Sequence, residues 1–192
     1  MFVEIIEERK CGECTVCCTS LHIDTKEFQK PPGVSCSHLC AQGCSIYATR
    51  YHACRDYHCG WRYLEFLSDN WRPDKSGVLL AFTPPDELPP GYATGVSFVL
   101  VGRPPSGFTR VLYHYVAGLI VDGVHVMLGV PGPPGEYPVV AFLNDELREA
   151  ALKRDFAPIE AVFAEAFALN GVPSRRFKKL VPYRVAKPSA AT

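Results

Sequence analysis

The stretch Cys11-Gly-Glu-Cys14-Thr-Val-Cys17-Cys18 opens a short segment that ends at Cys59 and holds all nine cysteines of the chain. A gap of two residues between cysteines lets a tight turn aim two thiolates at one metal ion, and Gly12 eases such a turn. If the stretch were helical instead, Cys11, Cys14 and Cys18 would share one face. Either geometry gathers three thiolates, so the segment is a candidate metal-binding region.

Metal ligation explains this distribution better than a disulfide framework does. The number of cysteines is odd, and the N-terminal residues Glu4, Glu7 and Glu8 stand where a secretory signal would carry basic and then continuous apolar residues. Disulfide frameworks form in oxidising compartments. The sequence therefore predicts a cytoplasmic protein whose thiolates hold a metal.

The number of metal sites is open at this point. Four thiolates complete one tetrahedral zinc site or hold one four-iron cluster, so the cysteines could supply one site or two. The spacing from Cys11 to Cys17 equals that of bacterial ferredoxins, but the fourth Cys followed by Pro is missing. Zinc and an iron–sulfur centre both stay candidates. Four histidines in or beside the segment could replace thiolates, and His38 is the best placed of the set His22, His38, His52 and His58.

Three further motifs follow the first, namely Ser35-Cys36-Ser-His-Leu39, Gly43-Cys44-Ser-Ile-Tyr47 and Cys54-Arg-Asp-Tyr-His-Cys59-Gly-Trp61. In this order the four motifs resemble the YkgJ-like cysteine-cluster family, which is described as a zinc- or iron-chelating domain with a CxxCxxCC signature. The resemblance covers residues 11–61. It implies a metal-binding set of eight residues: Cys11, Cys14, Cys17, Cys18, Cys36, Cys44, Cys54 and Cys59.

Two positions depart from the family pattern. Cys40 has no counterpart there and is expected to be dispensable for metal binding. The family usually has Arg-Pro where this chain has Arg50-Tyr51. Tyrosine does not fix the backbone dihedrals as proline does, so the local turn can differ while the ligands stay the same.

Composition restricts the partners. The chain has 192 residues, of which 47% are hydrophobic and 21% charged, as in folded globular proteins. Its formal net charge is zero, so no overall field attracts nucleic acid, and no apolar stretch approaches the roughly 20 residues that span a bilayer. We expect a metal ion as partner, without membrane or nucleic-acid binding, and leave a protein partner open. The basic stretch 171–192 is expected to be solvated or to dock on the acidic middle of the chain.

The sequence predicts an α+β fold with a cysteine-rich module, 1–62, and an antiparallel β-rich region with C-terminal helices, 63–192, or one core shared by both. Strands are predicted at 77–82, 94–101, 110–121 and 124–130. A turn at Asp122-Gly123 would make the last two a hairpin, with His114 and His125 on one face but roughly 20 Å apart. Helices are predicted at 145–154, with Asn144 as N-cap, and from Pro158 to the stop at 170–171.

Three functions follow from these patterns. The first is a metal-binding protein that chelates zinc or an iron–sulfur centre. The second is a redox or protein-modifying enzyme that uses a thiolate or an open metal position. The third is a metal carrier, for which adjacent Cys17 and Cys18 would suit a transfer site. The sequence contains no phosphate loop, dinucleotide fingerprint or active-serine elbow.

Overall fold

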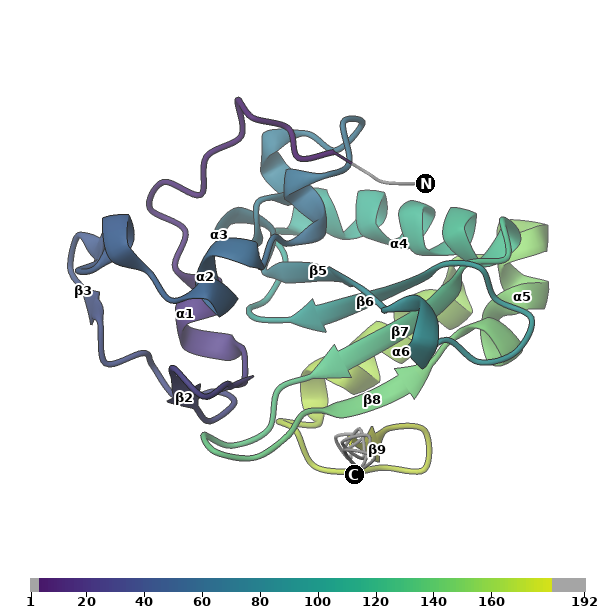
Figure 1. Ribbon diagram of the computed structural model, residues 1–192. Coiled ribbons are helices and arrows are strands. Elements are labelled where there is room, and N and C mark those ends of the chain that lie inside the picture. The colour runs from purple at the N-terminus through teal and green to yellow at the C-terminus, as the bar shows by residue number, and fades with distance from the viewer. Residues whose placement is uncertain (1–3, 181–192) are drawn as a thin grey trace, which may run out of the picture.

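A five-stranded sheet organises the computed structural model, which describes residues 4–180 (Figure 1). Its strands run in the order β5 (Val78–Phe82), β6 (Gly95–Leu100), β7 (His125–Val130), β8 (Val139–Phe142) and β9 (Lys178–Lys179). β6 and β7 are parallel, and the other neighbouring strands are antiparallel. The α+β class is confirmed, and the sheet is mixed rather than antiparallel throughout. The last twelve residues of the basic stretch, 181–192, lie outside the described residues.

The strand predicted at 110–121 is wrong, because these residues belong to helix α4 (Ser106–Val121). Phe108, Leu112, Val116 and Ile120 follow one another at four-residue intervals, and all four are buried. That spacing builds one apolar helix face, which outweighs the β-branched composition. The predicted hairpin is therefore absent, and α4 instead provides the crossover that a parallel pair such as β6 and β7 requires.

The Asp122-Gly123 pair ends α4 instead of joining two strands. Gly123 adopts a left-handed φ of 74°, and its N–H donates to the carbonyl of Ile120 at 3.2 Å. Glycine is the usual residue at this position after a helix, because it has no Cβ to clash. The same dipeptide thus serves as a helix stop, and the chain enters β7 two residues later.

The two predicted C-terminal helices are present as α5 (Asn144–Lys153) and α6 (Ala157–Ala168). The predicted N-cap role of Asn144 is wrong, since its side chain makes no capping bond. Its Oδ1 accepts from the N–H of Val126 at 2.8 Å, and its Nδ2 donates to the carbonyl of Val124 at 2.6 Å. Asn144 is 3% exposed and fastens the start of α5 to the start of β7.

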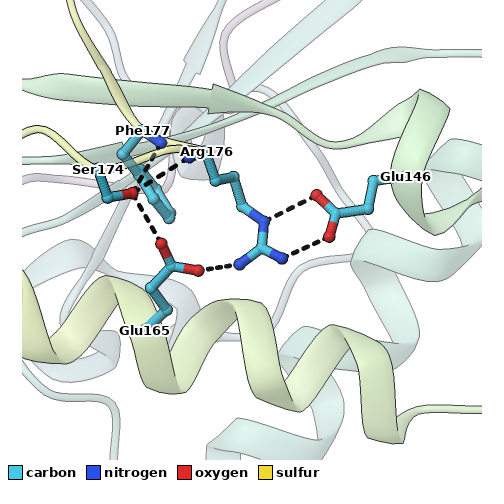
Figure 2. A network of polar contacts seen from close by, with 5 residues as sticks. All are labelled: Glu146, Glu165, Ser174, Arg176 and Phe177. Carbon is cyan, nitrogen blue, oxygen red and sulfur yellow. Dashed lines mark hydrogen bonds and ion pairs between the residues drawn. The ribbon is translucent and has the colours of Figure 1, made fainter.

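Arg176 joins the segment before β9 to both C-terminal helices, as Figure 2 shows. Its guanidinium forms ion pairs with Glu146 of α5 and Glu165 of α6, with an Nε to Oε2 distance of 2.7 Å to Glu146. The hydroxyl of Ser174 donates to Glu165 at 2.7 Å. Side-chain pairing thus holds the short edge strand in place.

The core lies between the sheet and the helices, which pack against one another and against β7. Its completely buried members come from strands and helices alike: Phe98, Leu112, Ile120, Leu128, Leu147, Ile159, Phe163 and Phe177. None of the described helices is both long and apolar enough to cross a bilayer.

The cysteine-rich region lies beside this core and consists of short elements (Figure 1). They are α1 (Val16–Ser20), β1 (Ile23–Asp24), β2 (Gln29–Lys30), β3 (Leu39–Cys40), β4 (Gly43–Cys44), η1 (Tyr47–Thr49), α2 (His52–Asp56) and η2 (Gly60–Arg62). The linking elements η3 (Asp69–Trp71), α3 (Pro73–Ser76) and η4 (Pro85–Glu87) follow. Apart from Pro32, residues 4–60 contain no buried aliphatic or aromatic side chain, and the apolar core begins at Trp61.

Several contacts attach this region to residues 61–180, which we call the core domain, and two of them involve the backbone closely. Gly60 packs so closely on β5 that a Cβ there would lie 2.8 Å from the Cβ of Leu80. The N–H of Gly135 donates to the carbonyl of Pro32 at 2.8 Å. The boundary predicted between residues 62 and 63 stays a prediction, with Trp61 on its N-terminal side already part of the core.

Candidate functional site

A cavity of about 270 Å³ opens among the short elements of the cysteine-rich region. Seven of the nine cysteines line it: Cys11, Cys14, Cys17, Cys18, Cys36, Cys44 and Cys54. Cys59 and Cys40 do not. All nine are free thiols, and Cys40 alone among them is exposed. Cysteines as far apart in sequence as Cys11 and Cys54 thus lie around one cavity, whereas Cys59, which the resemblance includes, lies outside its lining.

The first motif combines the two geometries considered from the sequence. Cys11 and Cys14 lie in a turn, in which the N–H of Cys14 donates to the carbonyl of Cys11 at 2.9 Å and Gly12 adopts a φ of 56°. Cys17 and Cys18 follow in the helix α1. The turn therefore carries one pair of thiols and the helix carries the next.

The second and third motifs form a small hairpin that returns to α1. The N–H of Cys36 donates to the carbonyl of Cys18 at 2.9 Å, and the N–H of His38 donates to the sulfur of Cys36 at 3.4 Å. In the hairpin, Leu39 pairs with Cys44. Cys54 comes from α2. Backbone hydrogen bonds hold these loops where the thiols can gather.

Within the described residues, the cysteine side chains are not arranged around one metal position. Across residues 4–180, no group of three or more Cys, His, Asp or Glu side chains is arranged as ligands of one ion. The loops place seven cysteines around the cavity, and each thiol can turn about its one side-chain dihedral angle between staggered rotamers.

The thiols differ in their electrostatic surroundings. Cys17 donates a hydrogen bond to Cys18, which lowers the pKa of Cys18 and, together with burial, raises the pKa of Cys17. The positive charges of Lys30 and Arg50 lower the pKa of Cys18 further, against the effect of its burial. Burial raises the pKa of Cys14 to about 11. Cys18 is therefore the thiol most readily ionised, and thiolate is the form that binds metals.

Lys30 is a buried cation beside these thiols, with 3% of its surface exposed. Its Nζ donates to the carbonyl of Val34 at 2.7 Å and to that of Pro31 at 3.3 Å. Burial lowers the pKa of Lys30, and the neighbouring cysteines, Cys36 and Cys18 first, act in the opposite direction. A buried lysine without a carboxylate partner is uncommon, and thiolates would supply the missing negative charge.

Three further polar atoms around the cysteines are buried without a hydrogen-bond partner, namely Arg50 Nε, Tyr57 Oη and Arg62 Nε. Buried donors are nearly always paired in proteins. Tyr57 lines the cavity, and its pKa is raised by burial and by the charges of Cys59 and Cys17. Arg62 Nη1 lies 3.9 Å from the sulfur of Cys11. Unpaired buried donors therefore lie close to the cysteines.

The histidines are placed unequally. His22 and His38 line the cavity. His38 Nε2 lies 3.3 Å from the hydroxyl of Tyr51, and His22 Nδ1 lies 3.3 Å from the hydroxyl of Tyr137. His58 Nδ1 lies 3.1 Å from the carbonyl of Asp56, and the side chain of His52 is exposed. His38 thus has a polar partner already and is better suited to orient a neighbouring loop than to replace a thiolate.

His114 and His125 lie away from this cavity, in the helical and strand layers. The hairpin on which their separation was predicted does not exist. The ring of His114 packs on Phe156, with centroids 4.1 Å apart, and that of His125 stacks on Phe142 at 4.8 Å. His125 is buried in the core domain, whereas His114 is exposed and packs on Phe156 at the surface.

Sequence reasoning did not find the roles of Lys30, Arg50, Tyr57 and Arg62. Each residue type is common on protein surfaces, and only the folded chain places these side chains among the thiols. One signal was available for the last two, since Tyr57 lies within the fourth motif and Arg62 directly follows it. Comparison with known proteins gave no match to a family model, a curated protein or a solved structure.

Proposed function

We propose that the protein binds zinc or an iron–sulfur centre through its cysteine cluster. The observation that supports this proposal is the convergence of seven thiols from four chain segments around one cavity. Residues 4–60 lack an apolar core of their own, and in such small modules a metal commonly replaces that core. We also propose the cytoplasm as the location, where thiols are kept reduced and free to bind metal.

The donor set suits such a group. Thiolate sulfur is the preferred ligand of structural zinc and of iron–sulfur clusters. The unpaired donors of Arg50, Tyr57 and Arg62 would find acceptors in metal-bound sulfur, and Lys30 would offset negative charge. When bound, the metal would cross-link the loops that carry the cysteines.

Purification without oxygen, followed by metal and acid-labile sulfide analysis and a visible spectrum, tests the proposal. We expect tightly bound zinc in a colourless protein, or iron with sulfide in a brown one. The matched variants are the double substitution Cys11→Ser with Cys14→Ser, which should lose metal, and Cys40→Ser, which should not. Protein without zinc or iron, whose cysteines had formed disulfides, would contradict the proposal.

A metal carrier is the second candidate, and one observation favours it. None of the nine cysteines is fully buried. The pKa of Cys18 is lowered by the hydrogen bond with Cys17 and by the charges of Lys30 and Arg50, which favours its thiolate form. A carrier should yield its metal to a chelator within minutes, whereas a closed structural site should hold it for hours. A redox or protein-modifying enzyme is the third, for which the Cys17–Cys18 pair would supply the reactive thiol.

A further inference from the structure

A second cavity lies in the core domain, at the β9 side of the sheet, and no described residue of the cysteine-rich region lines it. Its volume is about 810 Å³, within the range of roughly 300–1,000 Å³ that is typical of small-molecule sites. The lining comes from strands β7 and β8, from helices α5 and α6, and from the segment that leads into β9. The cavity is therefore large enough for a small organic ligand.

One part of the lining is apolar and belongs to the sheet, namely Met127 of β7 with Val140 and Phe142 of β8. Side chains alternate between the two faces of a strand. Leu128 and Ala141, their neighbours in the two strands, are buried in the core. The three lining residues therefore lie on the other face of the sheet, where they are half-buried, and Met127 pairs with Phe142 across the strands. Contiguous apolar side chains on an open face commonly mark a binding site.

The remaining lining is charged, and most of this charge is compensated internally. Arg176 lies between Glu146 and Glu165 and forms ion pairs with both, as Figure 2 shows. Both carboxylate oxygens of Glu146 accept from this guanidinium. The second oxygen of Glu165 accepts from the hydroxyl of Ser174 at 2.7 Å. The two carboxylates thus have their partners within the network, so they do not require a cationic ligand.

Two further cations, Arg175 and Lys178, line the cavity and are exposed. Within residues 4–180, neither takes part in an ion pair, and the ammonium of Lys178 donates only to the carbonyl of Ser174, at 3.2 Å. The lining therefore holds three cations against two carboxylates, which leaves one positive charge. A cavity with this charge attracts a ligand with one negative charge.

We infer that this cavity binds a small apolar monoanion, such as a medium-chain carboxylate. The hydrocarbon part of the ligand would lie on Met127, Val140 and Phe142, and its carboxylate would pair with Arg175 and Lys178. The apolar wall supplies affinity for the body of the ligand, and the two cations select its charge. The inference is independent of the proposed metal binding, since the two cavities share no lining residue.

Methionine provides a probe inside the cavity, because the chain contains only Met1 and Met127. Full-length protein labelled with ¹³C at the methionine methyl groups is titrated with sodium octanoate at neutral pH under reducing conditions. We expect a saturable shift of the methyl resonance that is absent from the Met127→Leu variant, while the resonance of Met1 keeps its position. Octan-1-ol, which has the same chain without the charge, should bind roughly tenfold more weakly or worse.

Matched variants test the role of the cations. Arg175→Gln with Lys178→Gln should raise the dissociation constant of octanoate roughly tenfold, because two exposed ion pairs are lost. Lys75→Gln with Arg110→Gln removes the same charge from exposed positions outside the cavity and should change that constant by less than about twofold. The inference is overturned if millimolar octanoate leaves the Met127 methyl resonance unshifted, if octanol binds as tightly as octanoate, or if both double variants lose affinity equally.

Discussion

The guanidinium of Arg9 lies over the indole ring of Trp61, with its Cζ 5.3 Å from the ring centroid. From this position it donates hydrogen bonds to the carbonyls of Trp61, Leu64, Glu65 and Leu67, at 2.9 Å to Leu64 and 3.1 Å to Glu65. One side chain of the cysteine-rich region thus pairs the carbonyl groups of the chain where it enters the core.

Arg9→Ala should lower the free energy of unfolding by about 1–3 kcal/mol, because it leaves several partly buried carbonyls without a donor. Urea denaturation at neutral pH measures the change. Lys10→Ala is the control, since Lys10 is the exposed neighbour of Arg9. Equal stability of both variants would show that water replaces the guanidinium without cost.

Asn144→Ala should be more damaging than its position at a helix start suggests. The substitution leaves the N–H of Val126 and the carbonyl of Val124 without their partner at the start of β7. Each buried unpaired group costs roughly 1–3 kcal/mol. We expect a loss of about 2–4 kcal/mol in thermal or urea unfolding. Arg148→Ala, on the exposed face of the same helix, should change stability by less than about 0.5 kcal/mol. A similar small loss at Asn144 would contradict the bridging role.

The Arg176 network should make stability depend on acid pH. The hydrogen bond from Arg176 lowers the pKa of Glu146 below its ordinary value of 4.5, against the effect of burial. A lowered pKa in the folded state stabilises the protein above the unfolded value, and this contribution is lost as pH falls through the folded value. Arg176→Gln should therefore cost about 1 kcal/mol at neutral pH. The difference from the unsubstituted protein should shrink below about pH 4.

Unfolding curves at several pH values check this, with Lys179→Gln as control. Lys179 pairs with Glu136 at the surface, where both side chains are 52% exposed, and its removal should have little effect at any pH. An Arg176→Gln deficit that stayed constant from neutral pH to pH 3 would mean that the arginine acts by packing and not by charge.

Lys30→Met should weaken metal binding by the proposed cysteine cluster, whose cavity Lys30 lines. Replacing a buried cation next to metal-bound sulfur removes charge compensation, and changes of this kind typically cost 10- to 100-fold in affinity. Competition with a chromophoric chelator measures the affinity. Lys26→Met is the control, because Lys26 is exposed on the same connection. Unchanged affinity in Lys30→Met would show that the lysine serves only its two carbonyl partners.

Metal removal should unfold the cysteine-rich region and spare the core domain. Residues 4–60 have no apolar core, whereas α4 and β7 are buried against each other. Structural metal binding can contribute roughly 10–16 kcal/mol, as much as a whole domain's stability. Amide hydrogen exchange after chelation should show loss of protection before Trp61 and retained protection in β7. Uniform loss would indicate one cooperative unit.

Much of the core domain could be predicted from sequence, because its patterns are local. Strands at 77–82, 94–101 and 124–130 match β5, β6 and β7 within one or two residues, and both C-terminal helices were located. The strand prediction for 110–121 is wrong because valine and aromatic residues, which favour strands, are frequent there. The spacing of Phe108, Leu112, Val116 and Ile120 contains the helical signal, and its first member lies before residue 110.

The candidate site was predictable only in part. The resemblance implied a set of eight cysteines, and seven of the nine lie around the cavity. The way they come together could not be read from sequence. It depends on the hydrogen bond from Cys36 to Cys18 and on the hairpin that carries Cys44. The role of Lys30 depends on burial, which a single lysine in a sequence does not reveal.

The close packing of η2 on β5 has a consequence for the fate of the metal-free protein. β5 is an edge strand of the sheet and has the apolar sequence Val-Leu-Leu-Ala-Phe. The element η2, at the end of the cysteine-rich region, contacts β5. An uncovered apolar edge strand is a template for pairing with other chains. If the loops that carry the cysteines open, that edge loses part of its cover. The first effect of metal loss on the protein would then be aggregation through this edge, with the core domain still folded.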